Sequence, residues 1–332
     1  MKSNQSLQHQ FDTAIHVITE RPLKRGDVGI EIESECPIKS TPPQNFWNSN
    51  ILKFDKSPSY WVAKPDNSLR NGLEYVTRSP VAISKLDGAL DEWLKYIKGT
   101  PFREDSIRTS IHVHRNVLGL TINQLLAVIG GWWLLETPIV DTQGIHRRGN
   151  LFCLRLQDAD YILIEVFNTL GRGRPFLDGV LGDNVKYGAL NLAAVERYGS
   201  LEFRFLKGTN DIKEIKQWAV FFHELCSKLA DYGHINELIR DVETCGSVVW
   251  AKKMLPKWIL EGETEESLRH KIETNYSYVY ALMYRVRDVQ VPSPVIYAFP
   301  ASEEDNPFVQ IEEEESWDSP DTSHLVDDDN DF

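Results

Sequence analysis

Apolar and polar residues alternate along four short segments of the chain, and a period of two predicts β-strands. In the first segment, the side chains of Val28, Ile30 and Ile32 share one face. Glu31 and Glu33 therefore stand side by side on the other face. Two carboxylates at this spacing repel each other and are costly to take out of water, so such a pair persists most easily in solvent or around bound cations.

The other three segments have polar faces of the same kind. These faces carry Glu74 in residues 73–77, His112 and His114 in residues 110–114, and Glu202 with Arg204 in residues 200–205. Each strand alone could be an ordinary amphipathic edge whose charged face lies in solvent. Because the pattern recurs within one chain, we interpret the four polar faces together as a metal site built from carboxylates and imidazole.

Apolar residues at helical spacing predict helices between and after these strands. The helices are expected over residues 83–97, 125–136, 211–229, 235–242, 248–260 and 265–275. Thr121 and Gln124 form a capping box for the second helix, which Pro138 is expected to end, and Asn210 or Asp211 caps the third. Pro256 predicts a break in the fifth helix. Prolines also predict loops or an inserted hairpin over residues 37–65 and an extended segment over residues 286–300.

Charge divides the chain into a neutral body and an acidic end. The 332 residues include 36 Lys and Arg against 49 Asp and Glu, a net charge of -13. Residues 302–332 contain 13 of the acids and no Lys or Arg. We therefore predict a lead over residues 1–25, a folded domain over residues 26–300 and a disordered acidic tail over residues 301–332. The tail, which ends in Phe332, is a candidate for docking a partner protein or serves only solubility.

The remaining composition narrows the classes of function. A neutral body argues against broad binding of nucleic acid. The longest apolar stretch, residues 125–135, is too short to cross a bilayer, so we expect no membrane span. The four cysteines are widely spaced and include no Cys-x-x-Cys pair, which predicts neither a disulfide framework nor a zinc site. Together with the absence of a secretory signal pattern, this favours a reducing compartment such as the cytoplasm.

Short motifs follow one another along the chain in a specific order. They are Gly29-Ile30-Glu31-Ile32-Glu33, Asp66-Asn67-Ser68-Leu69 with Glu74-Tyr75-Val76-Thr77, His112-Val113-His114, Tyr187-Gly188-Ala189-Leu190-Asn191-Leu192, and Leu201-Glu202-Phe203-Arg204 leading to Gly208-Thr209. This order resembles the amidoligase family, a branch of the carboxylate–amine ligases related to glutamine synthetase and glutamate–cysteine ligase. The resemblance covers residues 26–232. It implies an α+β fold in which a curved, mainly antiparallel sheet of the glutamine synthetase type lines the active site and is backed by helices.

The resemblance implies a set of metal ligands. Glu31 and Glu33 correspond to a Glu-x-Glu strand that binds two divalent ions. Glu74, His112 and Glu202 complete the implied set. Oxygen ligands with one imidazole suit Mg²⁺ or Mn²⁺, and about two such ions would neutralise four clustered carboxylates.

The resemblance also implies residues that contact ATP and substrate. His114 and Asn191 are expected to contribute to nucleotide binding, and Arg204 is expected near the transferred phosphoryl group. Arg147 or Arg148 corresponds to a clamp for a carboxylate or phosphate. Asp66 is a candidate for accepting the amine proton, although the same segment is also an ordinary turn. The family often has arginine where this chain has Lys186, which replaces a bidentate contact by a point charge.

The resemblance implies an ATP-dependent carboxylate–amine ligase that forms an amide through an acyl phosphate, and the metal-binding residues are consistent with such chemistry. The carboxylate and amine substrates, peptides or proteins among them, are not defined by the sequence. Relatives of this kind occur in phages and bacteria, which implies the cytoplasm of a bacterial host, and glutamine synthetase adds the homo-oligomer as a candidate assembly. Two alternatives stay open: a metal-dependent phosphotransferase or hydrolase with the same metal site, and a non-catalytic interaction protein that docks through its acidic tail.

Overall fold

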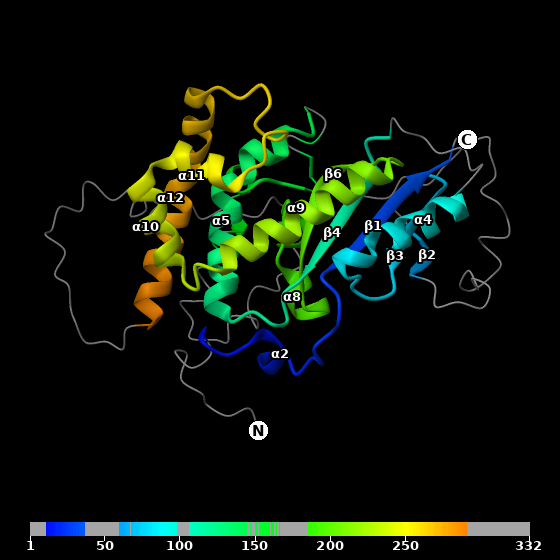
Figure 1. The fold of residues 1–332 in the computed structure, drawn as a ribbon, viewed down its shortest axis with the longest axis horizontal. Helices are drawn as coiled ribbons and strands as arrows, with labels where there is room; N and C mark the ends of the chain where they lie inside the picture. The colour runs from blue at the N-terminus through cyan, green and yellow to red at the C-terminus, as the bar shows by residue number, and fades with distance from the viewer. Residues whose placement is uncertain are drawn as a thin grey trace, which may run out of the picture. The chain divides into compact units, whose positions relative to one another are not determined.

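Six strands form one antiparallel sheet in the computed structural model of the described residues (Figure 1). The strands are β1 (Val28–Glu35), β2 (Trp61–Pro65), β3 (Gly72–Thr77), β4 (Ser110–Asn116), β5 (Leu190–Asn191) and β6 (Ser200–Lys207). Their order across the sheet is β2-β3-β1-β4-β6-β5, so β1 lies between two paired neighbours. The prediction of a mixed fold of helices and an antiparallel sheet is confirmed.

The structure describes residues 11–36, 60–66, 68–97, 106–144, 147, 150–151, 153–159, 161–162, 164, 166 and 185–290. These residues all belong to a unit that spans residues 1–291. Several sequence predictions concern residues outside the described set: Arg148, the segment 37–59, the end of the predicted extended segment at 291–300, and the acidic tail. They remain predictions.

Helices occupy most of the remaining described chain. They are α2 (Ile15–Ile18), α4 (Leu86–Ile97), α5 (Ile122–Asp141), α8 (Ala193–Tyr198), α9 (Ile212–Ala230), α10 (Ile235–Cys245), α11 (Ser247–Met254) and α12 (Glu265–Gln290), with 3-10 turns η1 (Ile83–Lys85), η3 (Leu156–Asp158) and η4 (Val185–Tyr187). Among the described helices, none combines the length and the hydropathy that a membrane span requires.

Two predicted helix starts have the expected capping bonds. The Thr121 hydroxyl accepts a hydrogen bond from the Gln124 backbone N–H at 3.2 Å, and the Gln124 side chain accepts one from the Thr121 N–H at 3.0 Å. Asp211, rather than Asn210, caps α9 by accepting a bond from the Lys213 N–H. These side chains satisfy backbone donors that the first helical turn leaves without partners.

Proline was a poor guide to where α5 ends. The helix continues through Pro138 to Asp141, although proline removes one backbone donor and crowds the preceding turn. Every side chain from Leu125 to Val140 is buried, so tertiary packing holds this helix together in spite of the local cost. The predicted break at Pro256 is confirmed, since α11 ends at Met254, but the predicted continuation to residue 260 is wrong because residues 257–260 are not helical.

Helix α12 extends well beyond the predicted end at Asn275. The expectation of an extended segment from residue 286 is therefore wrong for residues 286–290, which are helical. The buried side chains of Val279, Leu282 and Val286 continue the apolar stripe of the helix past Asn275. Asn275 itself is buried and donates a hydrogen bond to Thr137 Oγ1 at 3.1 Å. The residue at which the sequence predicted the end of the helix therefore joins α12 to α5.

The apolar face of the sheet packs against α9, which crosses β4 and β1 with α4 beside it (Figure 1). Phe203 of β6 lies at the centre of this contact. Its ring stacks on Phe222 of α9 with 4.0 Å between centroids and meets Trp132 of α5 edge-on at 4.8 Å. The helices therefore cover one face of the sheet and leave the polar face, with its acids and histidines, directed away from this core.

A buried carboxylate lies in α5, apart from the polar face of the sheet. Glu136 accepts hydrogen bonds from Trp132 Nε1 at 3.1 Å and from the Leu156 backbone N–H at 2.6 Å. Burial disfavours its charged form and raises the pKa of Glu136 to about 7. The group therefore joins α5 to η3 but penalises the folded state when it ionises.

The variant Glu136→Gln is expected to lose the pH dependence of stability that Glu136 causes. The raised pKa means that the penalty is absent below the ordinary value of 4.5 and complete above about 7, so wild-type stability falls as pH rises through this window. Glutamine removes the charge and keeps one of the two acceptor oxygens, so relative to the wild type its unfolding free energy should rise by on the order of 2 kcal/mol between about pH 5 and about pH 8.

Urea unfolding at about pH 5 and about pH 8 measures this difference, because the penalty is small at the lower pH. The exposed Glu261→Gln variant is the control and should shift neither value. A difference in unfolding free energy between Glu136→Gln and the wild type that is the same at about pH 5 and about pH 8 would contradict the argument, since burial would then not penalise the ionised carboxylate.

Candidate functional site

Strand register brings the predicted acids and histidines to one face of the sheet. It sets Glu31 opposite His112, Glu33 opposite Glu74, His114 opposite Glu202 and Asn191 opposite Glu202. Acids and histidines therefore lie opposite one another on neighbouring strands, in addition to alternating with apolar residues along each strand. Residues from β1, β3, β4, β5 and β6 meet on this face, which we call the carboxylate face.

The side chains of the carboxylate face are close enough to share cations. Ligand atoms lie within 4.8 Å of one another in three groups: Glu31 with Glu74 and His112, Glu31 with His114 and Glu202, and Glu33 with Asp66 and Glu74. All five residues predicted as metal ligands belong to these groups. Glu33, Glu74, His112 and Glu202 are buried, so their charges require compensation from nearby groups or ions.

His112 lies at the centre of the carboxylate face. Its Nδ1 atom is 3.0 Å from Glu31 Oε2 and 3.4 Å from Glu202 Oε1. Its Nε2 atom is 2.8 Å from the hydroxyl of Ser110, which also donates a hydrogen bond to Glu33. Burial and the nearby Arg204 oppose protonation, but the surrounding glutamates outweigh them and raise the pKa of His112.

His114 supports the other side of Glu31. Its Nε2 atom is 3.2 Å from Glu31 Oε1, and its Nδ1 atom is 3.0 Å from Ser200 Oγ. Burial opposes protonation, yet Glu31 and Glu202 raise the pKa of His114. The two histidines in turn hold the pKa of Glu31 well below its ordinary value, against the effect of burial. Protonation of the two histidines would supply positive charge where the sequence predicts divalent ions, and a metal ion bound by His112 would compete with the proton for the ligating nitrogen.

Comparison with known proteins identifies no relative from which a function for the carboxylate face could be inferred. The chain matches no protein-family model and no curated protein. The side chains that surround the carboxylates therefore carry the functional interpretation.

Two neighbours fix the orientation of Glu202. Arg204 Nη1 donates to Glu202 Oε1 at 2.6 Å, and Asn191 Nδ2 donates to Oε2 at 2.6 Å. The side-chain Oδ1 atom of Asn191 accepts a hydrogen bond from the backbone N–H of Ala193 at the start of α8. Asn191 thus positions a predicted metal ligand, while the partly exposed Arg204 lies beside the cluster as the sequence predicts.

The strand that carries Arg204 is irregular at this point. The β4–β6 register shifts between the pair Ile111–Leu206 and the pair Val113–Phe203, so β6 holds one more residue than β4 there. The Arg204 N–H donates to the Ala189 carbonyl on the other side of β6. Such irregularities redirect side chains near functional sites.

The other predicted catalytic residues differ in their surroundings. Arg147 is buried, and its Nη2 atom donates to the Thr109 carbonyl at 2.8 Å and the Leu206 carbonyl at 2.5 Å. These bonds favour a structural role in joining β4 and β6 over the predicted role as a substrate clamp. Asp66 Oδ1 accepts a bond from the Ser68 N–H at 2.7 Å, as in an ordinary turn, and its carboxylate also lies in the group with Glu33 and Glu74.

A pocket of about 240 Å³ opens beside Glu31 and His114. Lys24, Lys64 and Arg78 bring positive charge to its lining, and the Tyr198 ring lies edge-on to His114 with 6.0 Å between centroids. Sequence reasoning missed these four residues. Lys64 shows why. It lies in β2, a strand within the segment predicted as loops or a hairpin, and its Nζ atom is 2.7 Å from a carboxylate oxygen of Glu74 in β3.

Sequence reasoning also missed Glu35, which follows Glu31 and Glu33 on the same face because β1 extends to this residue. Glu35 is buried, and it accepts hydrogen bonds from the Arg70 N–H at 2.6 Å and from Ser106 Oγ at 2.7 Å. The period of two could have predicted its position if the strand had been extended by one pair of residues. Its partners indicate that it holds two loops at the end of the sheet.

Proposed function

We propose that the chain is an ATP-dependent carboxylate–amine ligase that forms an amide through an acyl phosphate. The observation that carries the proposal is the gathering of Glu31, Glu33, Glu74, His112 and Glu202 into overlapping groups with ligand atoms within 4.8 Å. The type of reaction is inferred from the resemblance to the amidoligase family. The same resemblance is the reason for proposing that the antiparallel sheet belongs to a fold of the glutamine synthetase type.

The donor set fits Mg²⁺ or Mn²⁺. Carboxylate oxygens with an imidazole match the preferences of these hard cations, and none of the three groups contains a thiol. Glu31, Glu33, Glu74, His112 and Glu202 would hold the ions. Bound there, divalent ions would neutralise the carboxylates and supply Lewis-acid stabilisation of phosphate oxygens.

The chain's own side chains divide the remaining tasks. Lys24 and Arg78 give the pocket beside Glu31 a positive lining that suits phosphates, and Tyr198 offers an aromatic surface. Arg204, whose guanidinium contacts the predicted metal ligand Glu202, would stabilise the equatorial oxygens of a transferred phosphoryl group. Asp66 lies beside Glu33 at the opposite end of the carboxylate face and would accept the proton of the attacking amine.

The proposal predicts that binding of a non-hydrolysable ATP analogue depends on Mg²⁺ and on the carboxylate face. In calorimetry, the Glu31→Gln/Glu202→Gln variant should bind the analogue with Mg²⁺ about a hundredfold more weakly than the wild type, because two charged ligands are lost. The matched control is Glu237→Gln/Glu261→Gln, which removes two exposed carboxylates and should bind as the wild type does.

The outcome also separates the alternatives. A folded wild type that binds no analogue would reject the ligase and shift the interpretation to a non-catalytic interaction protein. Mg²⁺-dependent binding followed by phosphate release that no amine accelerates would instead identify a phosphotransferase or hydrolase. Release of ADP that depends on both a carboxylate and an amine, screened among amino acids and peptides, is the result that the proposal expects.

A further inference from the structure

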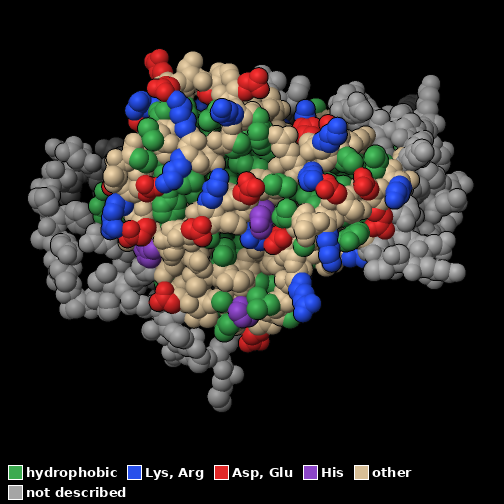
Figure 2. All heavy atoms as spheres, in the orientation of Figure 1, with side chains coloured by type: hydrophobic (Ala, Val, Ile, Leu, Met, Phe, Trp, Pro, Cys, Tyr) green, Lys and Arg blue, Asp and Glu red, His purple; other side chains and the backbone are tan. Residues whose placement is uncertain are grey.

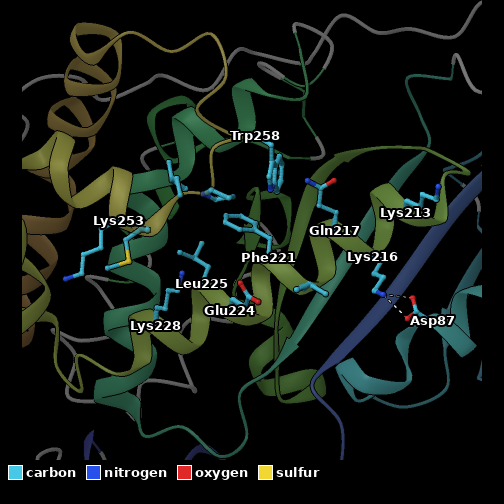
Figure 3. Close-up of a pocket in the computed structure, with 14 residues that line it drawn as sticks. Asp87, Lys213, Lys216, Gln217, Phe221, Glu224, Leu225, Lys228, Lys253 and Trp258 are labelled. Atoms are coloured by element: carbon cyan, nitrogen blue, oxygen red, sulfur yellow. Dashed lines mark hydrogen bonds and ion pairs between the residues drawn. The ribbon is translucent and has the colours of Figure 1, made fainter.

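A second concave surface lies on the helical side of the sheet, away from the carboxylate face. It is a groove of about 620 Å³ between α9 and the segment formed by the end of α11 and the turn after it, compared with about 240 Å³ for the pocket beside Glu31 (Figures 2 and 3). In the space-filling view of this side, hydrophobic side chains reach the surface between Lys and Arg side chains (Figure 2). We call this surface the α9 groove.

The floor of the α9 groove is apolar and rigid. Phe221 and Leu225 of α9 lie on one side of it and Trp258 on the other (Figure 3), and Met254 and Leu255 also line it. The Trp258 ring lies 5.7 Å from that of Phe221 in an edge-on contact, so its position is fixed by packing. An ordered aromatic and aliphatic floor of this kind suits the apolar side chains of a bound peptide, because it is already formed before binding.

Lysines stand at both ends of the α9 groove. Lys213 and Lys216 lie at one end, and Lys228 and Lys253 lie at the other (Figure 3). Two of them have acidic partners: Lys216 is 2.6 Å from Asp87, and Lys253 is 3.1 Å from an Asp241 oxygen. Within the described part of the chain, Lys213 and Lys228 form no ion pair, so both are available to carboxylates of a ligand.

We propose that the α9 groove docks an acidic segment of a partner protein, with apolar side chains on the floor and carboxylates beside Lys213 and Lys228. The residues of α9 that line the groove recur at helical spacing, so the groove follows one face of α9 from Lys213 to Lys228. The docking surface lies on the opposite side of the sheet from the carboxylate face, so it is independent of the proposed ligase chemistry.

Charge and shape favour a peptide over other anionic partners. Glu224 lies within the lining between the two lysine ends, where it would repel the evenly spaced charges of a phosphodiester backbone, whereas a peptide can place an uncharged residue there and its carboxylates at the lysine ends. The apolar side chains line a hollow, whereas insertion into a lipid surface requires apolar groups that protrude. An acidic peptide with aromatic or aliphatic residues complements both features.

The test is selection of a random peptide library, displayed on phage, against the full-length protein. Selected peptides should combine Asp or Glu with aromatic or aliphatic residues, and their affinity should fall with added salt. In fluorescence anisotropy, the Lys213→Glu/Lys228→Glu variant should bind these peptides about tenfold more weakly, because two attractions become repulsions.

The matched control is Lys85→Glu/Lys95→Glu, which reverses the charge of two exposed lysines outside the groove. Lys95 lies in the last turn of α4, as Lys228 lies in the last turn of α9. This control should bind the peptides as the wild type does. The proposal would be overturned if the selected peptides lacked acids or if both double variants bound them with equal affinity. It would also be overturned if phosphatidylserine vesicles or single-stranded oligonucleotides, in place of peptides, bound in a lysine-dependent way. Unchanged thermal unfolding of both variants separates these outcomes from misfolding.

Discussion

Replacing Arg204 by alanine should lower the turnover of ATP by about a thousandfold while leaving the affinity for Mg²⁺ and the ATP analogue within severalfold of the wild type. The reason is that a guanidinium aimed at a transferring phosphoryl group acts mainly in the transition state, when charge spreads over the equatorial oxygens. Glu202 would keep its hydrogen bond from Asn191 in this variant, so the metal ligands should stay in place.

Steady-state kinetics of ADP release, together with calorimetry, distinguishes this role from a structural one. Arg204→Lys is the informative companion, because it keeps the positive charge and loses the planar fork, and it should recover only part of the rate. Arg197→Ala, a change of an arginine on α8, is the control and should turn over ATP normally. An Arg204→Ala protein whose analogue binding falls as much as its turnover would show that Arg204 supports the metal site and not the transition state.

Replacing Phe203 by alanine should lower the free energy of unfolding by about 4 kcal/mol. Phe203 is fully buried between Phe222 and Trp132, and the rings that surround it come from two helices that would have to shift to fill a cavity of that size. Urea unfolding followed by circular dichroism measures the loss. Because Phe203 stands between Glu202 and Arg204 on β6, the same change should also weaken the Mg²⁺-dependent binding of the ATP analogue.

Two further variants calibrate the result. Phe203→Leu retains much of the buried volume and should cost less than about 2 kcal/mol. Leu94→Ala removes an apolar side chain that is 41% exposed and should change stability by less than about 0.5 kcal/mol. A Phe203→Ala protein as stable as the Leu94→Ala protein would mean that the aromatic contact between β6 and α9 contributes little to the fold.

The sequence predicted the carboxylate face better than it predicted the limits of the helices. Alternation is a local signal with a strict period, so it placed Glu31, His112 and Glu202 on the correct side of each strand. It could not supply the strand order or the register, and both were needed to bring these residues within reach of one another. The helix that continues through Pro138 illustrates the opposite case, because its stability comes from neighbours that are distant in sequence.

The residues missed by sequence reasoning share a physical reason. Lys64, Arg78 and Tyr198 belong to the pocket beside Glu31 only because β2, β3 and α8 converge there, and no pattern in their own segments marks them. Arg147 shows the reverse: its position in a short motif suggested substrate binding, whereas its Nη2 atom donates to the carbonyl of Thr109, just before β4, and to that of Leu206 in β6. A motif identifies a residue type, but the partners of that residue are set by tertiary structure.

The extra residue of β6 at Arg204 has a consequence for motion. The main chain there is not matched residue for residue by β4, whereas Phe203 and Phe205 are buried on the other face of the strand. Local opening at such an interruption costs less free energy than opening in the regular ladder, so amide hydrogens at the register shift should exchange faster than those of β1. Arg204 could then move between Glu202 and a bound phosphate by a local adjustment, while the rest of the sheet keeps its hydrogen bonds.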